Sequence, residues 1–434
     1  MLATVPLILP SRVWAQATAP SKRLTIGCIG MGKQLGYHLG ALINQDDVEV
    51  VAVCDVDTTR REHRKKMVDD AYSAKAGATY KGCAAYNDFR ELLARKDIDA
   101  VLIATPDHWH AFIAIAAVKA GKDVYCEKPL TYNIHESIEL VQAVRKANRI
   151  FQVGSQQRSS KEFRVACELV RNGVLGRVSA INVSFGDPAK PYHQPTEAVE
   201  PGLDWNFWCG PGPLVGYNPS LSPRGVHDNY PDWRLTWEFG GGMITDWGAH
   251  HIDIAQWAMG MDGSGPVEVR APQDWSTAKR GAQLVYADGT VVTHVRGKGV
   301  SFIGTEGECH VNRGQFELIM DGKPVHKFWN KETDRTTSME REVTLTEREY
   351  LADAKIKLYN SKSHMQDFLD AVQSRKLPIC DVAIGASSVK ACHLMNFAYH
   401  YGANAKWNPA RDKFTHGGDS KWLTREHYRD GWVV

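Results

Sequence analysis

Residues 23–57 restrict the fold of this chain more than any other stretch, because they spell a strand, a tight turn, a helix and a second strand. Leu24–Ile29 and Val48–Cys54 are apolar runs of strand length, and Leu35–Ile43 between them has the composition of a helix. Two parallel strands joined by a helix are the unit from which doubly wound α/β sheets are built. The stretch therefore predicts the start of such a sheet.

The turn in this unit carries residues typical of a dinucleotide site. Gly30 and Gly32 flank Met31 and let the backbone approach a pyrophosphate, whose charge then lies at the positive end of the helix. Asp55 follows the second strand 23 residues after Gly32, where its carboxylate can accept hydrogen bonds from both ribose hydroxyls. The third glycine, Gly36, comes one residue late, so the prediction depends on the order of elements as well as on the glycines.

The alternation of strands and helices continues to about Val153. Further strands are expected at Ala100–Ala104, Asp123–Cys126 and Ile150–Val153, and helices at Thr58–Ala74, Phe89–Ala94, Ala111–Ala120 and Ile134–Ala147. Short connections and right-handed crossovers make this one parallel sheet. We therefore expect a dinucleotide-binding domain over residues 23–153.

Beyond residue 153 the pattern changes to that of a second domain, over residues 154–434. A helix at Lys161–Asn172 leads to a strand at Val178–Phe185 and then to a long loop, 186–237, rich in Pro, Gly and Trp. Short strands follow at Val267–Ala271, Ala282–Tyr286, Thr290–Arg296, Ser301–Gly304, Glu308–Asn312 and Phe316–Met320, and late helices near Ser363–Ser374 and Ile384–Gly402. This series predicts an α+β domain with a mainly antiparallel sheet, against which the late helices pack back.

The composition of the 434 residues is that of a globular protein, with 43% hydrophobic and 24% charged residues. The length exceeds one ordinary core, which agrees with two domains. A net charge of +2 without a basic stripe argues against nucleic-acid binding, and beyond the first residues no segment is apolar enough to span a membrane. The nine cysteines lack Cys-x-x-Cys spacing, which favours buried free thiols over a disulfide or zinc framework.

Residues 1–22 read as the remnant of an export signal and a linker. Leu2–Leu9 is mostly apolar, and small residues at Ala15 and Ala17 have the spacing of a signal-peptidase site. No basic residue precedes the apolar run, so the segment resembles the end of a longer signal. It predicts a periplasmic or secreted protein, and a disordered extension on a cytoplasmic protein is the alternative.

Two polar motifs follow neighbouring strands of the predicted parallel sheet. Thr105-Pro106, with His108 and His110 close behind, follows one strand, and Glu127-Lys128-Pro129 follows the next. In open α/β sheets, ligands bind beyond the carboxyl ends of the strands. Both motifs are therefore expected beside a bound dinucleotide.

A third motif supplies acid–base groups, because Asp246 and His250 follow the glycines at residues 240–242. Oxidation of a carbinol carbon needs a base for the hydroxyl proton and positive charge beside the developing alkoxide. A histidine suits the first task near neutral pH, and Lys128 suits the second. If a helix begins near Thr245, Asp246 and His250 share a face, and Asp246 can orient the imidazole or hold a sugar hydroxyl. We expect Lys128, Asp246 and His250 to be catalytic.

The neighbours His250, His251 and Asp253 are also three ligand types in a row. Adjacent helical residues diverge by about 100°, so the two histidines are poorly placed to share one ion, and no metal site is expected. Together with His250, several residues of the second domain are expected to contact substrate: Arg158, Trp205, Tyr230, Arg234 and Glu238.

In their joint order, these motifs resemble those of the glucose-fructose oxidoreductase, inositol dehydrogenase and MocA (Gfo/Idh/MocA) family of nicotinamide-dependent sugar oxidoreductases. The pieces that match are the glycine turn, Thr105-Pro106 with His110, Glu127-Lys128-Pro129, and Asp246 four residues before His250. The tryptophan-rich loop is similar to that of the exported branch of the family. The resemblance implies a Rossmann domain joined to an open antiparallel sheet that holds substrate and builds a homodimer or homotetramer.

The resemblance runs from about Arg23 to Phe414 and implies a nicotinamide cofactor. Asp55 favours NAD, because its carboxylate would repel the 2′-phosphate of NADP, whereas Arg60, Arg61 and Arg64 leave NADP as an alternative. The cofactor contacts that we expect are Gly30, Met31, Gly32, Asp55, Arg60, Thr105, Pro106, His108, His110, Glu127 and Lys128.

Two reactions fit these residues. The leading hypothesis is an oxidoreductase that transfers a hydride between a secondary hydroxyl of a sugar or glycoside and tightly held NAD. The alternative, which the resemblance also implies, is an NAD-dependent glycoside hydrolase, in which transient oxidation acidifies the adjacent C–H, the aglycone leaves by elimination, and the ketone is reduced again. A nicotinamide-binding sensor without catalysis is disfavoured by the intact Lys128, Asp246 and His250.

Overall fold

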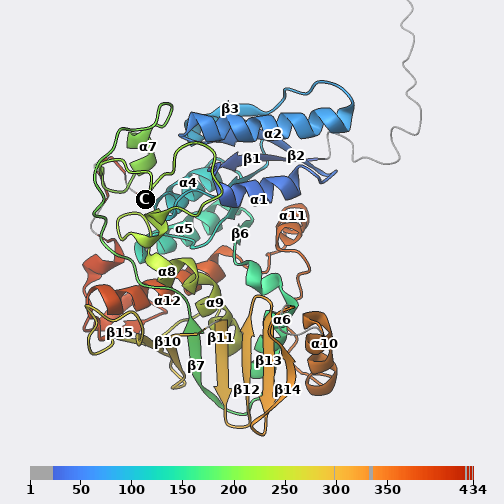
Figure 1. Ribbon diagram of the computed structural model, residues 1–434, viewed down its shortest axis with the longest axis vertical. Helices are drawn as coiled ribbons and strands as arrows, with labels where there is room; N and C mark the ends of the chain where they lie inside the picture. The colour runs from blue at the N-terminus through green and yellow to red at the C-terminus, as the bar shows by residue number, and fades with distance from the viewer. Residues whose placement is uncertain (1–22, 298, 332–335, 426–427, 430, 433) are drawn as a thin grey trace, which may run out of the picture.

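The computed structural model describes residues 23–297, 299–331, 336–425, 428–429, 431–432 and 434. Two sheets dominate it and follow one another along the long axis of the molecule (Figure 1). The predicted export signal at residues 1–22 lies outside the described residues. Within the described residues, no helix has both the length and the apolar character needed to cross a membrane.

The first sheet has six parallel strands in the order β3-β2-β1-β4-β5-β6, which is the doubly wound arrangement expected from the sequence. Its strands are β1 (Leu24–Ile29), β2 (Val48–Cys54), β3 (Ala84–Tyr86), β4 (Ala100–Ile103), β5 (Asp123–Cys126) and β6 (Phe151–Val153). The helices between them are α1 (Lys33–Leu42), α2 (Thr58–Ala76), α3 (Phe89–Ala94), α4 (Asp107–Lys119) and α5 (Ile134–Ala147). The predicted Rossmann fold is confirmed.

The strands of this sheet are apolar on both faces because helices cover both faces. Every residue of β4 and β5 is buried, and β2 is buried at all but one position. Cysteines take part in this packing: Cys28, Cys54 and Cys126 lie in strands and are buried. All nine cysteines are free and buried, so the expectation of free thiols is confirmed.

The second sheet has ten strands in the order β14-β13-β12-β11-β7-β10-β9-β8-β15-β16, and only β7 and β10 pair in parallel. Its strands are β7 (Val178–Ser184), β8 (Glu268–Arg270), β9 (Gln283–Val285), β10 (Val291–Val295), β11 (Gly299–Gly304), β12 (Gly307–Asn312), β13 (Gln315–Met320), β14 (Lys323–Phe328), β15 (Ala405–Asn408) and β16 (Lys413–His416). The expected large, mainly antiparallel sheet is therefore present.

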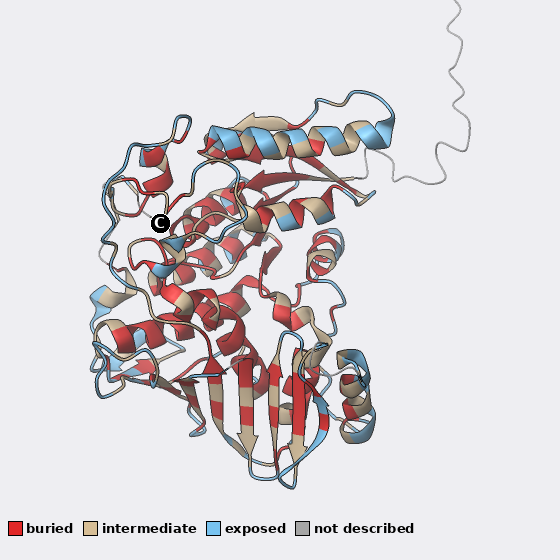
Figure 2. Ribbon diagram, in the orientation of Figure 1, coloured by how far each residue is buried: buried red, intermediate tan, exposed pale blue. Residues whose placement is uncertain are grey.

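Helices pack against one face of the second sheet, and the strands alternate between buried and less buried residues (Figure 2). They are α6 (Lys161–Arg171), α9 (Gly248–Met259), α10 (Met339–Tyr350) and α12 (Val382–His400). Helix α11 (His364–Ser374) instead packs on the first sheet, where Phe368 and Leu369 join the same apolar cluster as Val50 and Leu102. The sequence did not predict β3, β14, β15, β16 or α10.

The long loop at residues 186–237 covers the carboxyl edge of the first sheet. It contains the short helix α7 (Trp205–Cys209) and the turn η4 (Asp232–Leu235). It is tied to the start of α2, because the Thr58 N–H donates to the Gly202 carbonyl at 3.0 Å and the Asp204 N–H donates to the Val56 carbonyl at 3.0 Å. The loop therefore roofs the edge where a doubly wound sheet binds its ligand.

Trp205 belongs to the interior of this roof. Its ring stacks on Trp208 with centroids 4.6 Å apart, and its Nε1–H donates to the Val215 carbonyl at 2.8 Å. It lies in an apolar cluster with Tyr217 and Phe239. The prediction that Trp205 contacts substrate is therefore wrong, because this side chain packs the roof against itself.

Arg158 joins the two parts of the molecule. It lies in the turn η3 (Gln156–Ser159), its side chain is 1% exposed, and its guanidinium pairs with Asp253 of α9 at 2.7 and 2.8 Å. A second carboxylate, from Asp262, accepts from Nη2 at 2.7 Å. The prediction that Arg158 contacts substrate is wrong, because its donors neutralise carboxylates that hold α9 in place.

Replacing Arg158 by Met should destabilise the protein strongly, because Asp253 would remain buried without its cation. We expect a loss of about 3–5 kcal/mol in the free energy of unfolding, measured by urea denaturation. The matched control is Lys66→Met, which removes an exposed ion pair with Asp70 and should cost less than about 0.5 kcal/mol. Equal losses in the two variants would contradict the role assigned to Arg158.

Candidate active site

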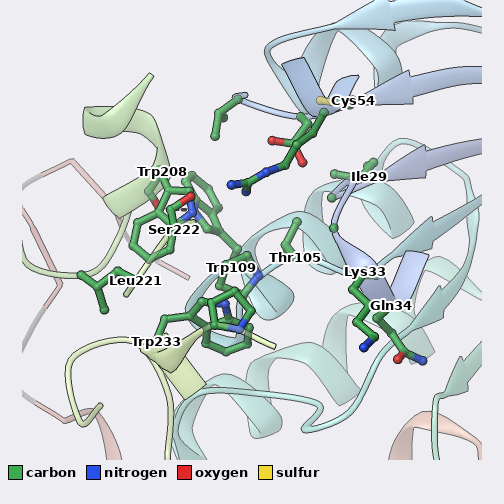
Figure 3. Close-up of a pocket in the computed structure, with 18 of the residues that line it drawn as sticks. Ile29, Lys33, Gln34, Cys54, Thr105, Trp109, Trp208, Leu221, Ser222 and Trp233 are labelled. Carbon is green, nitrogen blue, oxygen red and sulfur yellow. Dashed lines mark hydrogen bonds between the residues drawn. The ribbon is translucent and has the colours of Figure 1, made fainter. Parts of the chain in front are cut away.

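A cavity lies beyond the carboxyl ends of β1, β2 and β4. Aromatic and apolar side chains of the roof form one wall, and Figure 3 shows Trp208 and Leu221 across the cavity from Ile29. The opposite wall carries predicted cofactor contacts: Gly30, Gly32, Asp55, Arg60, Thr105 and Pro106. This is the position in which doubly wound sheets bind dinucleotides.

The glycine turn has the geometry that a pyrophosphate requires. Gly30 has a φ of +91°, and a Cβ there would lie 2.7 Å from the Ala104 carbonyl, so glycine is needed. At Gly32 a Cβ would meet no atom within 4 Å, so the backbone there is open. No side chain caps the start of α1, which leaves its N–H groups and positive dipole end for phosphate oxygens. These residues fit the pyrophosphate of NAD.

Asp55 forms the part of the cavity expected to hold ribose. Its Oδ2 accepts the N–H of Met31 at 2.6 Å, and its Oδ1 accepts the N–H of Asp57 at 2.8 Å. These bonds fix the carboxylate beside the glycine turn and leave lone pairs for ribose hydroxyls. Burial raises the pKa of Asp55 above its usual value.

The guanidinium groups of Arg60 and Arg61 both donate hydrogen bonds to backbone carbonyls of this chain. The Arg60 guanidinium donates to the carbonyls of Pro223 and Gly225 in the roof. Arg61 donates to the Asp55 carbonyl at 2.6 Å. The alternative in which these two guanidinium groups swing onto the 2′-phosphate of NADP finds no support in this arrangement.

The two histidines of the Thr105–His110 motif lie in α4 and point in different directions, because that helix begins at Asp107 and not at Ala111 as expected. His110 holds two strand-end turns together: its ring nitrogens lie 2.7 Å from the Pro129 carbonyl and 2.9 Å from the Thr105 carbonyl. His108 faces the roof instead, with Nε2 3.0 Å from the Trp208 carbonyl. The prediction that His108 contacts the cofactor is therefore wrong.

A second cavity adjoins the first and shares with it Lys33, Gln34, Ala104, Thr105, Tyr230, Trp233 and Arg234. All three predicted catalytic residues, Lys128, Asp246 and His250, line this second cavity. Lys128 comes from the turn after β5, whereas Asp246 and His250 come from α8 (Gly242–Asp246) and α9. The structure thus brings together side chains more than 100 residues apart.

Asp246 holds two cations at the junction of the cavities. Lys128 Nζ donates to its Oδ1 at 2.8 Å and to its carbonyl at 3.2 Å, while Arg234 donates to both carboxylate oxygens. Burial acts to raise the pKa of Asp246, but Lys128 and Arg234 outweigh it and lower that pKa below its usual value. Asp246 is therefore ionised and fixes both cations beside the cavity.

Glu127, which also lines the second cavity, is held in place by hydrogen bonds to neighbouring side chains. Its Oε1 lies 2.7 Å from His38 Nε2 and accepts from Gln156 Nε2 at 2.8 Å. Burial acts to raise the pKa of Glu127, but His38 and Lys128 lower that pKa to about 2. The carboxylate is a charged part of the wall, where its contact with the cofactor remains a prediction.

His250 lies just after a break in the helix expected from Thr245 onward, since α8 and α9 are separated at Trp247. In the described residues no hydrogen bond joins His250 to Asp246, so the expected orientation of the imidazole by Asp246 is wrong. His250 Nε2 instead lies 3.1 Å from Arg313 Nη2. Burial, reinforced by the charges of Lys128 and Arg313, lowers the pKa of His250 well below its usual value, so the ring is neutral and can accept a proton.

His251 points elsewhere. Its Nδ1 lies 2.8 Å from the Ser184 carbonyl of β7, and it is not part of the wall of either cavity. Of these two histidines, only His250 lines the same cavity as Lys128, so His250 remains the predicted base. Within the described residues, no group of three His, Cys, Asp or Glu side chains is placed to hold a metal ion.

Of the predicted substrate contacts, Tyr230 and Arg234 line both cavities. Their side chains pack together, with the Arg234 guanidinium 4.8 Å from the centre of the Tyr230 ring. Glu238 lies outside both walls, and its Oε2 accepts the N–H of Tyr192 at 3.0 Å. The structure thus does not bring Glu238 to either cavity wall, and its contact with substrate remains a prediction.

Sequence reasoning missed several residues of the second cavity, among them Asp107 and Arg313. Asp107 follows the Thr105-Pro106 pair, and burial together with the negative charge of Asp246 raises its pKa well above the usual value. Arg313 lies in the turn between β12 and β13. The Asp107 position could have been found in the strand-end motif, whereas nothing local marks which hairpin turn of the second sheet reaches the site.

Comparison with known proteins gives family matches for both domains. A family model described as an oxidoreductase family with an NAD-binding Rossmann fold matches residues 24–155, and the model of that family's C-terminal alpha/beta domain matches residues 169–312. The structure resembles scyllo-inositol dehydrogenase from Lactobacillus casei with bound NAD(H) and scyllo-inositol, at 18% identity and a TM-score of 0.55 over 88% of this chain and 98% of that one. At this identity the likeness shows the fold.

Curated relatives match over shorter stretches. Myo-inositol 2-dehydrogenase of Thermotoga maritima is 31% identical over 39% of this chain and 47% of its own length. A glycosyl hydrolase family 109 protein of Stenotrophomonas maltophilia is 27% identical over 48% of this chain and 47% of its own length. The chain thus spans about half the length of these relatives.

The two histidines can be separated by the variants His250→Gln and His251→Gln. We expect the first to lower kcat/KM about 100- to 10,000-fold and to flatten the acidic limb of its pH profile, because the proton acceptor is lost. The second keeps a donor for the Ser184 carbonyl and should change kcat/KM far less. A crippled His251 variant beside an active His250 variant would reverse the assignment.

Proposed function

Because the chain belongs to the Gfo/Idh/MocA oxidoreductase family, we propose that it oxidises a secondary hydroxyl of a sugar or glycoside with tightly held NAD. The observation that carries the proposal is the meeting of Lys128, Asp246 and His250 in the wall of a second cavity, which adjoins the cavity beside the glycine turn. NAD bound there would supply the hydride acceptor. The remaining chemistry belongs to side chains of this chain.

Lys128 and His250 have different roles at the hydroxyl that is oxidised. Neutral His250 accepts the hydroxyl proton, and its lowered pKa keeps it unprotonated over the neutral range. Lys128 holds positive charge beside the oxygen as it becomes an alkoxide. Asp246 positions both Lys128 and Arg234, which fixes the charge in place before the substrate binds.

Retention of the cofactor follows from the roof over the first cavity. The roof is tied to α2 by backbone hydrogen bonds and by Arg60, which donates to the Pro223 and Gly225 carbonyls. Release of a dinucleotide would require these contacts to break. We therefore expect NAD to stay bound through many turnovers, so the NADH formed by each oxidation must pass its hydride to a carbonyl substrate before the next hydroxyl is oxidised.

An NAD-dependent glycoside hydrolase is the second candidate, and the similarity to a glycosyl hydrolase family 109 protein favours it specifically. It would use the same oxidation, followed by elimination of the aglycone and reduction of the ketone. The two candidates differ in product. Incubation with a panel of glycosides yields a keto-sugar in the first case and a free aglycone without net oxidation in the second.

Location and assembly are further proposals. The leader-like composition of residues 1–22 supports export to the periplasm or beyond, with a cytoplasmic location as the alternative. A homodimer or homotetramer is the assembly that the family resemblance implies. Fractionation of cells and the mass in solution test these two proposals.

The variant Lys128→Met tests the proposed chemistry. We expect kcat to fall about 100- to 1,000-fold while NAD stays bound, because the lost charge acts mainly on the transition state. NAD released from the denatured variant measures its occupancy. Lys119→Met, at an exposed position of α4, is the control and should behave as wild type. A near-normal rate for Lys128→Met would show that the alkoxide is stabilised elsewhere.

A further inference from the structure

Arg313 comes from the second sheet, lines the second cavity and contacts His250, the proposed base. It lies in the tight turn between β12 and β13, at the edge of the second cavity. Its guanidinium lies over the Trp247 ring, 4.8 Å from the ring centre. Its Nη2 is 3.1 Å from His250 Nε2.

The contact between Arg313 and His250 fixes which nitrogen of the imidazole carries the proton. An arginine can only donate, so His250 Nε2 must accept, and the proton of the neutral ring lies on Nδ1. Nδ1 is buried and has no hydrogen-bond partner among the described residues. The lone pair that would take the substrate proton is therefore occupied by Arg313 when no substrate is bound.

Arg313 lacks the carboxylate partner that Lys128, Arg234 and Lys33 of the same cavity wall have. Lys128 and Arg234 both form ion pairs with Asp246. Lys33 lies 3.4 Å from an oxygen of Asp228. No carboxylate lies within ion-pair distance of Arg313 in the described part of the chain.

One further cation on the cavity wall has no carboxylate partner among the described residues, but it serves the cofactor side. The guanidinium of Arg64 packs over α1, where a Cβ on Gly36 would lie only 2.4 Å from Nη2. This places its charge beside the helix whose start is open to a pyrophosphate. Arg313 is thus the cation left for the substrate.

We propose that Arg313 selects an anionic substrate, a sugar or glycoside that bears a carboxylate, such as a uronic acid. The planar guanidinium matches a carboxylate through two parallel hydrogen bonds, and such bonds are stronger than the one it makes to a neutral imidazole. A bound carboxylate would draw Arg313 away from His250 Nε2 and free that lone pair for the hydroxyl proton. Recognition of the anion and release of the base are then one event.

This inference rests on the proposed oxidation, and matched substrates separate the two. The probes are the methyl glycosides of glucuronate and glucose, and those of galacturonate and galactose, given to the purified holoenzyme. We expect kcat/KM to be at least about tenfold higher for the acid of the preferred pair. Arg313→Gln should reduce that ratio by roughly 10- to 100-fold, and Arg313→Lys should retain part of it.

Two further measurements test the role of Arg313 independently of the ratio of kcat/KM values for acidic and neutral sugars. Calorimetry should detect glucuronate or galacturonate binding to the wild-type holoenzyme and its loss in Arg313→Gln. The acidic limb of the kcat/KM profile should move to higher pH in Arg313→Gln, because removal of a positive charge raises the pKa of His250. Lys323→Gln is the control, since Lys323 is an exposed cation beside the next hairpin turn, at the opposite end of the sheet.

The outcomes distinguish the proposals. If wild type oxidises none of the sugars, the proposed function fails. If it oxidises neutral glycosides as well as acidic ones, or if Arg313→Gln lowers both equally, the oxidation stands and the selection of a carboxylate is overturned. A preference for glucose 6-phosphate over glucuronate would overturn the carboxylate in favour of a phosphate.

Discussion

The ion pairs of Asp246 hold together every part of the site. This carboxylate is only 6% exposed, and it receives Lys128 from the turn after β5 and Arg234 from the end of the roof loop. A buried carboxylate without its cations is costly, so its two pairs hold the first sheet, the roof and α8 in one arrangement. That arrangement also fixes where the dinucleotide cavity opens into the second cavity.

The electrostatic character of the second cavity follows from this interaction. Asp246 carries one negative charge against the two positive charges of Lys128 and Arg234, so net positive charge stays beside the place where an alkoxide would form. Burial, together with the positive charges of Lys128 and Arg313, lowers the pKa of His250 and keeps its ring neutral and therefore able to accept a proton. A base held neutral beside a fixed cation is the combination that oxidation of a hydroxyl needs.

The sequence predicted the first sheet well because its signals are local. The strands Leu24–Ile29, Val48–Cys54 and Asp123–Cys126 have the predicted bounds, since each is a mostly apolar run that ends at a turn. The three-residue strand β3 has no such run, and β14 mixes exposed charge with proline, so neither was predicted. Polar residues at strand ends, Lys128 among them, were found for the same local reason.

Prediction from the sequence failed for side chains that bind residues far away along the chain. Arg158 was placed at the substrate, but Asp253, 95 residues later, takes its guanidinium. Trp205 and Glu238 make hydrogen bonds inside the roof. His108 faces the roof because α4 starts earlier than its apolar residues suggest. Arg313 escaped notice since only the tertiary fold tells which hairpin turn of the second sheet faces His250.

The most direct test of the central claim is a single turnover of the holoenzyme with a glycoside that carries deuterium at its carbinol carbons. Reduced nicotinamide, followed by its absorbance, should appear on mixing, and it should appear more slowly than with the unlabelled glycoside. Both net oxidation and hydrolysis through a transient ketone require this result. A glycoside that is converted at the same rate with either isotope, without any reduced nicotinamide, would show that the chemistry does not pass through the dinucleotide site.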